Sequence, residues 1–99
     1  MKSQTTEQYE LLFHYVSPPS RTCKMFLDEL KIPYKLTIIE LGKNQHKSPE
    51  FLKINPQMKI PVLHITRSDN SSQYIYESYA ILKYLSYKFP NQLIPVDDQ

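Results

Sequence analysis

Two short segments hold the residues whose types and spacing point most clearly to chemistry. Residues 59–63 (KIPVL) place a proline at the start of an apolar, strand-like run. Residues 76–81 (YESYAI) place an acid and a hydroxyl where a strand gives way to an amphipathic helix. The first turn of a helix has unpaired N–H groups and a partial positive charge. Together the two segments can therefore offer backbone donors, backbone acceptors and a hydroxyl to one small zwitterionic ligand.

The composition excludes several other classes of function. The chain has 99 residues, enough for one domain with a single core, and its formal net charge is +2. Its lysines are scattered and no basic run is interleaved with aromatic residues, so nucleic acid is not an expected partner. Cys23, the only cysteine, excludes an internal disulfide and fits a reducing compartment. Because no apolar run suits a signal peptide or a membrane span, we expect a cytoplasmic protein without a membrane partner.

The elements that must position these segments begin with a strand, a helix and a second strand. Residues 9–15 form a short, aromatic-rich run typical of a buried strand, and residues 34–39 form another. Between them, residues 20–30 have apolar positions at i, i+3, i+4 and i+7, which predict one buried helical face. These positions are Cys23, Phe26, Leu27 and Leu30. A strand, a helix and a strand at this spacing favour a right-handed crossover between two parallel neighbours.

The second half of the chain predicts a short helix, two strands and a last helix. A serine, a proline and a glutamate open residues 48–54 and suit an N-cap, a first-turn proline and a first-turn acid. Strands at residues 62–66 and 73–76 flank a polar, glycine-free segment, which favours a looped hairpin over a two-residue turn. The last helix is expected at residues 78–89. Its core stripe comprises Ile81, Tyr84 and Leu85.

The order of elements is therefore β-α-β, then a helix, then β-β-α. We expect an α/β domain with one four-stranded mixed sheet and helices on both faces, because the antiparallel hairpin must share a sheet with the parallel pair. This is the layout of a thioredoxin-like fold. The expected boundaries are a polar tail at residues 1–8, one domain at residues 9–90 and a linker or unpacked end at residues 91–99.

The chain resembles the N-terminal, glutathione-binding domain of the cytosolic glutathione transferases, most closely the theta class. Four stretches carry this resemblance: residues 17–21 (SPPSR), 44–48 (NQHKS), 59–63 (KIPVL) and 77–85 (ESYAILKYL). It extends over about residues 11–95. Members of the family usually continue into an all-helical second domain that supplies most of the pocket for the electrophile. This chain stops where the linker between the two domains would lie.

The resemblance implies a transferase that takes glutathione as co-substrate and stabilises its thiolate for attack on an electrophile, as in detoxification. The last helix would then receive the γ-glutamyl end of the ligand. Ser78 and the free helix amides would donate to the carboxylate, and Glu77 would pair with the ammonium group. The alternative from local structure is that Ser78 is only the N-cap and Glu77 only a first-turn acid offsetting the helix dipole.

The resemblance also makes Pro61 a cis proline, so that Ile60 meets the cysteinyl backbone of glutathione in a short ladder. The alternative is an ordinary trans proline at a strand edge, since only about 5–6% of X-Pro bonds in folded proteins are cis. His46, Lys47 and Lys59 would meet the glycyl carboxylate. Lys59 is the best placed of these because it directly precedes Ile60. The alternative for each is solvated surface, where most loop lysines lie.

Ser17 is the catalytic residue that the resemblance implies, as a hydrogen-bond donor to the glutathione sulfur. A free thiol has a pKa of about 8.5, and lowering it by about two units needs about 2.7 kcal/mol. One hydrogen bond to a charged group contributes about 1.5–3 kcal/mol, so a serine beside a helix N-terminus suffices. The alternatives are that Ser17 only caps the next helix, as Ser20 could also do, and that Tyr15 is the donor. We rank Tyr15 lower because we expect it to pack within its strand.

Redox and metal chemistry are not expected. Residues 17–20 (SPPS) occupy the place of the thioredoxin Cys-x-x-Cys pair, and Cys23 lies beyond that loop on the apolar helix face. His14 and His64 lie on predicted strands with no cysteine or carboxylate at ligand spacing, so no metal site is expected.

Three hypotheses for the whole chain follow. The first is the glutathione-binding half of a theta-like transferase, with a small-molecule electrophile as substrate and, as in the family, a homodimer. The second is a non-catalytic module that binds glutathione or docks on another protein. The third is a truncated piece of a two-domain transferase, because the chain stops within the expected linker. The residues do not select the electrophile.

Overall fold

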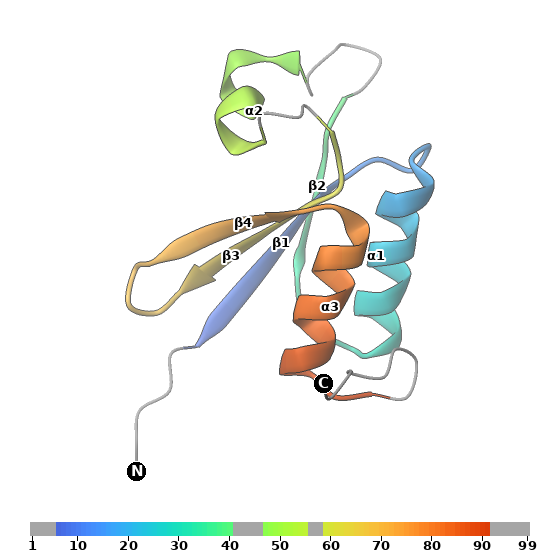
Figure 1. Cartoon of the computed structure of the whole chain (residues 1–99), viewed down its shortest axis with the longest axis vertical. Coiled ribbons are helices and arrows are strands. Elements are labelled where there is room, and N and C mark those ends of the chain that lie inside the picture. The colour runs from blue at the N-terminus through green and yellow to red at the C-terminus, as the bar shows by residue number, and fades with distance from the viewer. Residues whose placement is uncertain (1–5, 41–46, 56–58, 92–99) are drawn as a thin grey trace.

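Strands and helices follow one another in the order that the sequence predicts. The computed structural model describes residues 6–40, 47–55 and 59–91. Its elements are β1 (Glu7–Phe13), α1 (Pro18–Glu29), β2 (Lys35–Ile38), α2 (Pro49–Ile54), β3 (Val62–Arg67), β4 (Ser72–Tyr76) and α3 (Ser78–Lys88), shown in Figure 1. No helix in the described ranges is long and apolar enough to cross a membrane.

One mixed sheet joins the four described strands in the order β2-β1-β3-β4. β1 is parallel to β2, with Leu11 opposite Leu36, and antiparallel to β3, with Leu11 opposite Leu63. β4 pairs antiparallel with β3. The crossover through α1 allows the parallel pairing, since parallel strands cannot be joined by a tight turn. The predicted α/β, thioredoxin-like fold class is confirmed.

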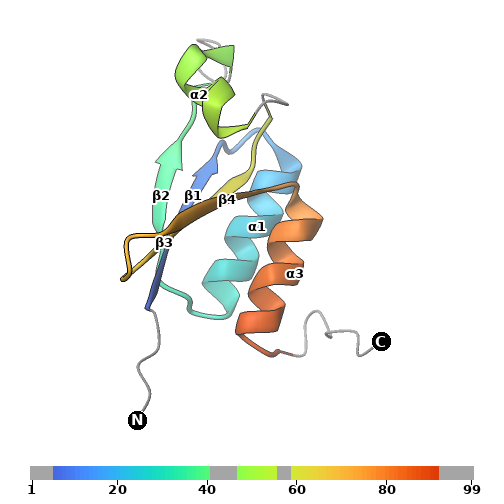
Figure 2. The same cartoon turned by 60° about the vertical axis from the view of Figure 1, so that its left-hand side comes forward.

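The two faces of the sheet bury separate clusters, because side chains alternate along each strand. Leu11 and Leu63 belong to the larger cluster, which α1 and α3 cover. Leu12 and Val62 point to the other face, where Phe51 of α2 packs on them. Figure 2 shows α1 and α3 on one side of the sheet and α2 near one end. Full burial of each such aliphatic side chain contributes about 1.5–3 kcal/mol.

Helices α1 and α3 lie side by side and begin at the same end of the sheet (Figures 1 and 2). The predicted apolar face of α1 is buried at Cys23, Phe26 and Leu27. In α3, Ile81 and Leu85 are fully buried, as predicted. The shared direction of the helices brings their first turns together, next to the start of β3.

The start of β1 is held by a polar cluster. The Glu7 carboxylate accepts hydrogen bonds from Arg67 Nε at 2.9 Å, the Tyr84 hydroxyl at 2.8 Å and the Tyr9 hydroxyl at 2.7 Å. Burial raises the pKa of Glu7, but these hydrogen bonds and a nearby lysine charge outweigh it, so the pKa lies below its ordinary value. The polar tail expected at residues 1–8 is therefore shorter, because β1 begins at Glu7.

The end of β1 also differs from the prediction. The strand ends at Phe13, and a turn follows in which Val16 N donates to His14 Nδ1 and Ser17 N donates to His14 O, both at 3.1 Å. Tyr15 lies in this turn, 56% exposed, with its ring edge-on to Phe13. The expectation that Tyr15 packs within the strand is wrong, because the backbone turns before it.

The β3–β4 hairpin has the looped connection expected from its glycine-free sequence. Residues 68–71 join the strands, and Arg67 N donates to Ser71 O at 2.9 Å. Asn70 has a φ of 71°, a left-handed conformation that asparagine adopts more readily than most residues.

A polar row crosses the sheet on the face that also carries α2. Thr37 Oγ1 donates to Glu10 Oε2 at 2.5 Å, and Glu10 Oε1 lies 3.1 Å from His64 Nδ1. The His64 ring stacks on Tyr74 with centroids 4.3 Å apart. Burial raises the pKa of Glu10, but the hydrogen bonds from Thr37 and His64 bring it below its ordinary value. The antiparallel register places Glu10 opposite His64, a pairing that sequence spacing did not reveal.

Candidate functional site

The two segments singled out in the sequence meet at one small pocket. It has a volume of about 160 Å³ and lies where the start of β3 approaches the first turns of α1 and α3. Its lining residues are Pro19, Asn55, Lys59, Ile60, Pro61, Glu77 and Ser78. Five of the predicted ligand-binding residues are therefore brought together, from positions as far apart in the chain as 59 and 78.

Two helix N-termini converge on this pocket. Pro19 belongs to the first turn of α1, and Ser78 is the first residue of α3. Each N-terminus carries unpaired N–H groups and a partial positive charge, which favour a negatively charged group nearby. The shared direction of α1 and α3 (Figure 1) therefore makes this end of the molecule suited to anions.

The backbone of Glu77 is unusual for a residue other than glycine. Glu77 is the N-cap of α3, with φ 75° and ψ 127°, and its side chain makes no capping hydrogen bond. Its carbonyl still accepts from Ile81 N at 3.0 Å, so the helix begins regularly. A conformation of this kind costs about 1–3 kcal/mol and persists where the surroundings enforce it, often at binding sites. The alternative with Ser78 as N-cap is wrong, because Ser78 is the first helical residue.

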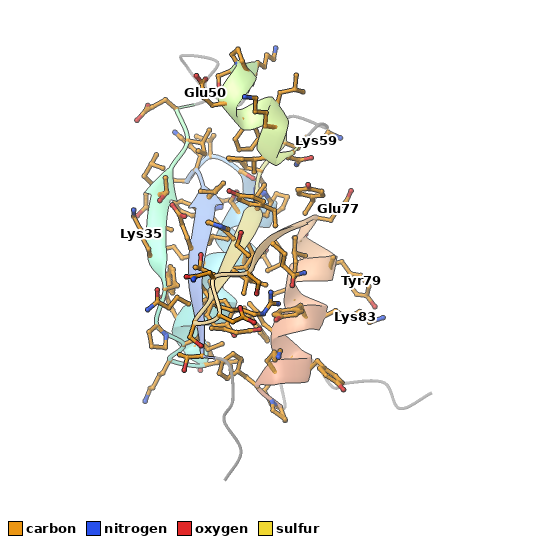
Figure 3. All side chains as sticks on the ribbon, turned by 90° about the vertical axis from the view of Figure 1, so that its left-hand side faces the viewer. Lys35, Glu50, Lys59, Glu77, Tyr79 and Lys83 are labelled. Atoms are coloured by element: carbon orange, nitrogen blue, oxygen red, sulfur yellow. The ribbon has the colours of Figure 1, made fainter. Side chains whose placement is uncertain are left out.

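Opposite charges stand at the rim of the pocket. Lys59 and Glu77 both line it and are both exposed. Figure 3 shows their side chains projecting to the same side of the molecule, Lys59 from the segment before β3 and Glu77 from the start of α3. A cation and an anion placed this way complement a ligand with both signs of charge.

The segment that enters β3 lines the same pocket. The peptide bond between Ile60 and Pro61 is cis, the geometry that the resemblance predicts. Pro61 is buried, and the Ile60 side chain packs against the smaller core cluster. Ile60 therefore both lines the pocket and packs against the core.

Ser17 lies at the edge of this region as the N-cap of α1. Its Oγ accepts a hydrogen bond from Ser20 N at 3.2 Å. A hydroxyl has one donor and two acceptor lone pairs, so capping leaves the Ser17 proton able to donate elsewhere. Ser17 is not among the pocket-lining residues, whereas Pro19, two residues further on, is.

Comparison with known proteins assigns the family. A family model described as glutathione S-transferase, N-terminal domain, matches residues 11–92. The chain belongs to this family. Human glutathione S-transferase theta-2 is 41% identical over 92 residues, which are 91% of this chain and 36% of that protein. Protein URE2 of Debaryomyces hansenii is 33% identical over 88 residues, which are 89% of this chain and 28% of that protein.

Solved structures agree with the family assignment. A glutathione transferase homolog from Drosophila mojavensis with bound glutathione aligns with a TM-score of 0.74 and 34% identity, covering 85% of this chain and 36% of that one. The chain thus spans about a third of the length of the relatives it matches. Because theta transferases and URE2 proteins both match, the comparisons assign the family and not the class.

Two predicted site residues of this transferase domain fall outside the pocket lining. Lys47 is exposed just before Ser48, the N-cap of α2, and does not line the pocket. Ser17 caps α1 as described above. His46 lies outside the described residues. Tyr15, the rival donor, is exposed and does not line the pocket either.

Sequence reasoning missed Asn55, the most buried polar residue of the lining. Its side chain is 1% exposed, and its Nδ2 donates to Lys59 O at 2.9 Å. In the sequence, Asn55 and Pro56 predict only the end of a helix. The signal that identifies Asn55 is its burial beside the pocket, which only the structure reveals.

Other parts of the transferase domain offer less for this chemistry. A larger hollow of about 490 Å³ lies beside Tyr9, Tyr34 and Phe89, at the end of α3 opposite its N-terminus. It therefore lacks the converging helix N-termini. Burial raises the pKa of the Cys23 thiol to about 12, so Cys23 stays protonated and unreactive in the core. Within the described ranges, no three His, Cys, Asp or Glu side chains are grouped to hold a metal ion.

Proposed function

We propose that this domain binds glutathione in the pocket between α1, α3 and the start of β3, and stabilises its thiolate for attack on an electrophile. The observation that carries the proposal is the convergence of two helix N-termini with Lys59 and Glu77 on one pocket. Glutathione has two carboxylates, one ammonium group, a peptide backbone and a thiol. Under this proposal, each of these groups would meet a complementary group at this end of the molecule.

The proposed assignment places the γ-glutamyl end at the start of α3. The Ser78 hydroxyl and the free amides of α3 would hold its carboxylate, and Glu77 would pair with its ammonium group. The Ile60 backbone would bond the cysteinyl residue. Lys59 would meet the glycyl carboxylate, together with Lys47 and the predicted His46. A relative supports the choice of ligand, since the Drosophila mojavensis homolog holds glutathione.

The proposed chemical step is activation of the glutathione thiol by Ser17. The Ser17 hydroxyl would donate to the sulfur and stabilise the thiolate, while the α1 N-terminus adds a favourable field. The thiol would release its proton to water, and the thiolate would attack the electrophile and form a carbon–sulfur bond. The sulfur electron pair would displace a leaving group with its bonding pair, or add to a multiple bond whose displaced pair then takes a proton from water. No protein base is required, because the nucleophile belongs to glutathione.

For the whole protein we propose only general properties, taken from its similarity to theta transferases. A theta-like class, detoxification of small electrophiles, a cytoplasmic location and a homodimer are the properties expected by similarity to theta transferases. Each is a proposal, because this chain spans about a third of those proteins.

A second candidate function is glutathione binding without catalysis. Its support is that Ser17, the proposed activating residue, is not in the lining of the pocket. Such a domain would hold glutathione at its two charged ends and leave the sulfur facing water.

A titration with glutathione tests the proposal. The isotopically labelled 99-residue chain is titrated while its amide chemical shifts are followed. We expect saturable shifts at Ile60, Glu77 and Ser78, and near Ser17. A dispersed spectrum that glutathione leaves unchanged would contradict the proposed site.

Kinetics with a chloronitrobenzene electrophile then separate the two candidate functions. A rate that saturates with electrophile and exceeds that of free glutathione supports a transferase. A rate that rises linearly, no faster than free glutathione, supports binding alone.

A further inference from the structure

We propose that Asn55 is a positioning residue of the glutathione site, which holds the Lys59–Ile60 peptide in the orientation that meets the ligand. The inference rests on the proposed function and adds a residue that the predicted site did not contain. Asn55 lines the pocket and is its most buried polar residue.

The burial of Asn55 requires a specific partner. Its side chain is 1% exposed, and an amide removed from water costs about 1–3 kcal/mol unless it forms hydrogen bonds. Asn55 Nδ2 donates to the carbonyl oxygen of Lys59 at 2.9 Å. A buried side-chain amide therefore meets the backbone at the residue that precedes the Ile60–Pro61 bond.

The other side of Asn55 is fixed to the core. Asn55 is the C-cap of α2, and its backbone N–H donates to Phe51 O at 2.8 Å. Phe51 is 3% exposed and packs with Leu12, Ile39 and Val62. Asn55 therefore joins the core cluster around Phe51 directly to Lys59 at the pocket.

The consequence for the ligand follows from the planarity of the peptide group. In a trans peptide the C=O and the next N–H point in opposite directions. Holding Lys59 O against Asn55 therefore directs the Ile60 N–H away from Asn55 and limits rotation of the Lys59 backbone. Both residues line the pocket, so this bond orients two of the groups proposed to bind glutathione.

Asn55→Ala tests the inference by glutathione titration of the whole chain. We expect affinity to fall about three- to tenfold, the value of one lost hydrogen bond. Ser48→Ala is the matched control. Ser48 caps the opposite end of α2, where its Oγ accepts from Phe51 N at 3.1 Å, and it does not line the pocket. If Asn55 only stabilised α2, Ser48→Ala would weaken binding to the same degree, and the inference would be overturned.

A double-mutant cycle identifies the group through which Asn55 acts. Asn55→Ala combined with Lys59→Met should weaken binding less than the product of the two single effects. The double variant Asn55→Ala with Ser78→Ala should lose glutathione affinity by the product of the two single losses, within about twofold. The reason is that Ser78 is on α3 and has no described bond to Asn55. If the loss of affinity equals the product of the single losses in both double variants, the inference is overturned.

A measurement on the unaltered chain keeps the test valid if Asn55→Ala does not fold. The Asn55 side-chain NH₂ resonance should exchange slowly with solvent and shift with the same saturation as the Ile60 amide. Rapid exchange and no shift, in a chain that binds glutathione, would overturn this inference alone. A chain that binds no glutathione would overturn the proposed function and this inference with it.

Discussion

At the scale of the residue, two groups of the candidate site also have a structural task. Ser17 caps α1 through Ser20 N, and Glu77 occupies the N-cap position of α3. In Ser17 the two tasks are compatible, because capping uses a lone pair while the proposed catalytic step uses the proton. Removing the hydroxyl therefore affects the helix and the thiolate separately, and the two effects can be measured apart.

Ser17→Ala should raise the pKa of the thiol of bound glutathione by up to about two units, towards the value of about 8.5 for a free thiol. Glutathione affinity should change only a few-fold, because the proposed binding groups are elsewhere. Loss of the cap should cost about 1 kcal/mol of folding stability. The ultraviolet absorbance of the bound thiolate, recorded against pH, measures the first effect.

Ser20→Ala is the control for this variant. Ser20 has a buried Oγ without a hydrogen-bond partner among the described residues, and its role as a cap donor uses only the backbone N–H. The thiolate titration should therefore stay unchanged in Ser20→Ala. If Ser17→Ala also leaves it unchanged, Ser17 is not the activating residue.

At the scale of the element, the start of α3 combines backbone strain with the proposed ligand contacts. Glu77 follows β4 directly, and its positive φ turns the chain from the strand into the helix. Glycine adopts such angles without a steric penalty, whereas alanine does not. The helix start therefore allows strain and ligand binding to be separated by two substitutions.

Glu77→Gly should raise the free energy of unfolding relative to Glu77→Ala by about 1 kcal/mol or more. Both variants lose the carboxylate, so both should bind glutathione more weakly than the unaltered chain by a similar factor. Urea unfolding gives the first comparison and glutathione titration the second. Equal stability of the two variants would show that the Glu77 backbone is not strained.

Helices and loops set by local sequence patterns were predicted correctly. Element boundaries that depend on contacts with residues far away in the sequence were predicted less well. Apolar spacing predicted α1 and the core stripe of α3, and the glycine-free segment predicted the looped hairpin. The start of β1 was missed because Glu7 is polar, and Arg67 and Tyr84 satisfy it from other elements. Tyr15 was misplaced because aromatic residues favour strands, while His14 closes a turn before it.

The candidate site shows the same division. Lys59, Ile60, Pro61, Glu77 and Ser78 were predicted from two motifs and do meet at one pocket. Asn55 was not predicted, because nothing in the local sequence reveals that its side chain is buried and bonded to Lys59 O. Backbone angles such as those of Glu77 are also set by neighbouring elements rather than by the residue itself.

At the scale of the whole molecule, two half-buried carboxylates join the strands to one another and to α3. Glu7 binds Arg67 of β3 and Tyr84 of α3, and Glu10 links Thr37 of β2 with His64 of β3. Their pKa values lie below the ordinary 4.5, because the hydrogen bonds they accept outweigh the effect of burial. Protonation must therefore act against folding.

Acid should destabilise this domain through Glu7 and Glu10. A carboxylate whose pKa is lower in the folded chain stabilises the fold above its unfolded pKa, and this stability is lost as pH falls through the folded value. We therefore expect the free energy of unfolding to fall steadily below about pH 4.5. Glu7→Gln should cost about 1.5–3 kcal/mol at neutral pH, since it loses hydrogen bonds to a charged group.

The decisive comparison is the pH dependence of these differences, measured by urea unfolding. The gap between the unaltered chain and Glu7→Gln or Glu10→Gln should narrow as pH falls below about 4.5, because acid neutralises the same carboxylates in the unaltered chain. Glu29→Gln, at the exposed end of α1, is the control and should leave the pH profile close to that of the unaltered chain. A gap that stays constant down to about pH 3 would show that these carboxylates stabilise the fold by shape rather than by charge.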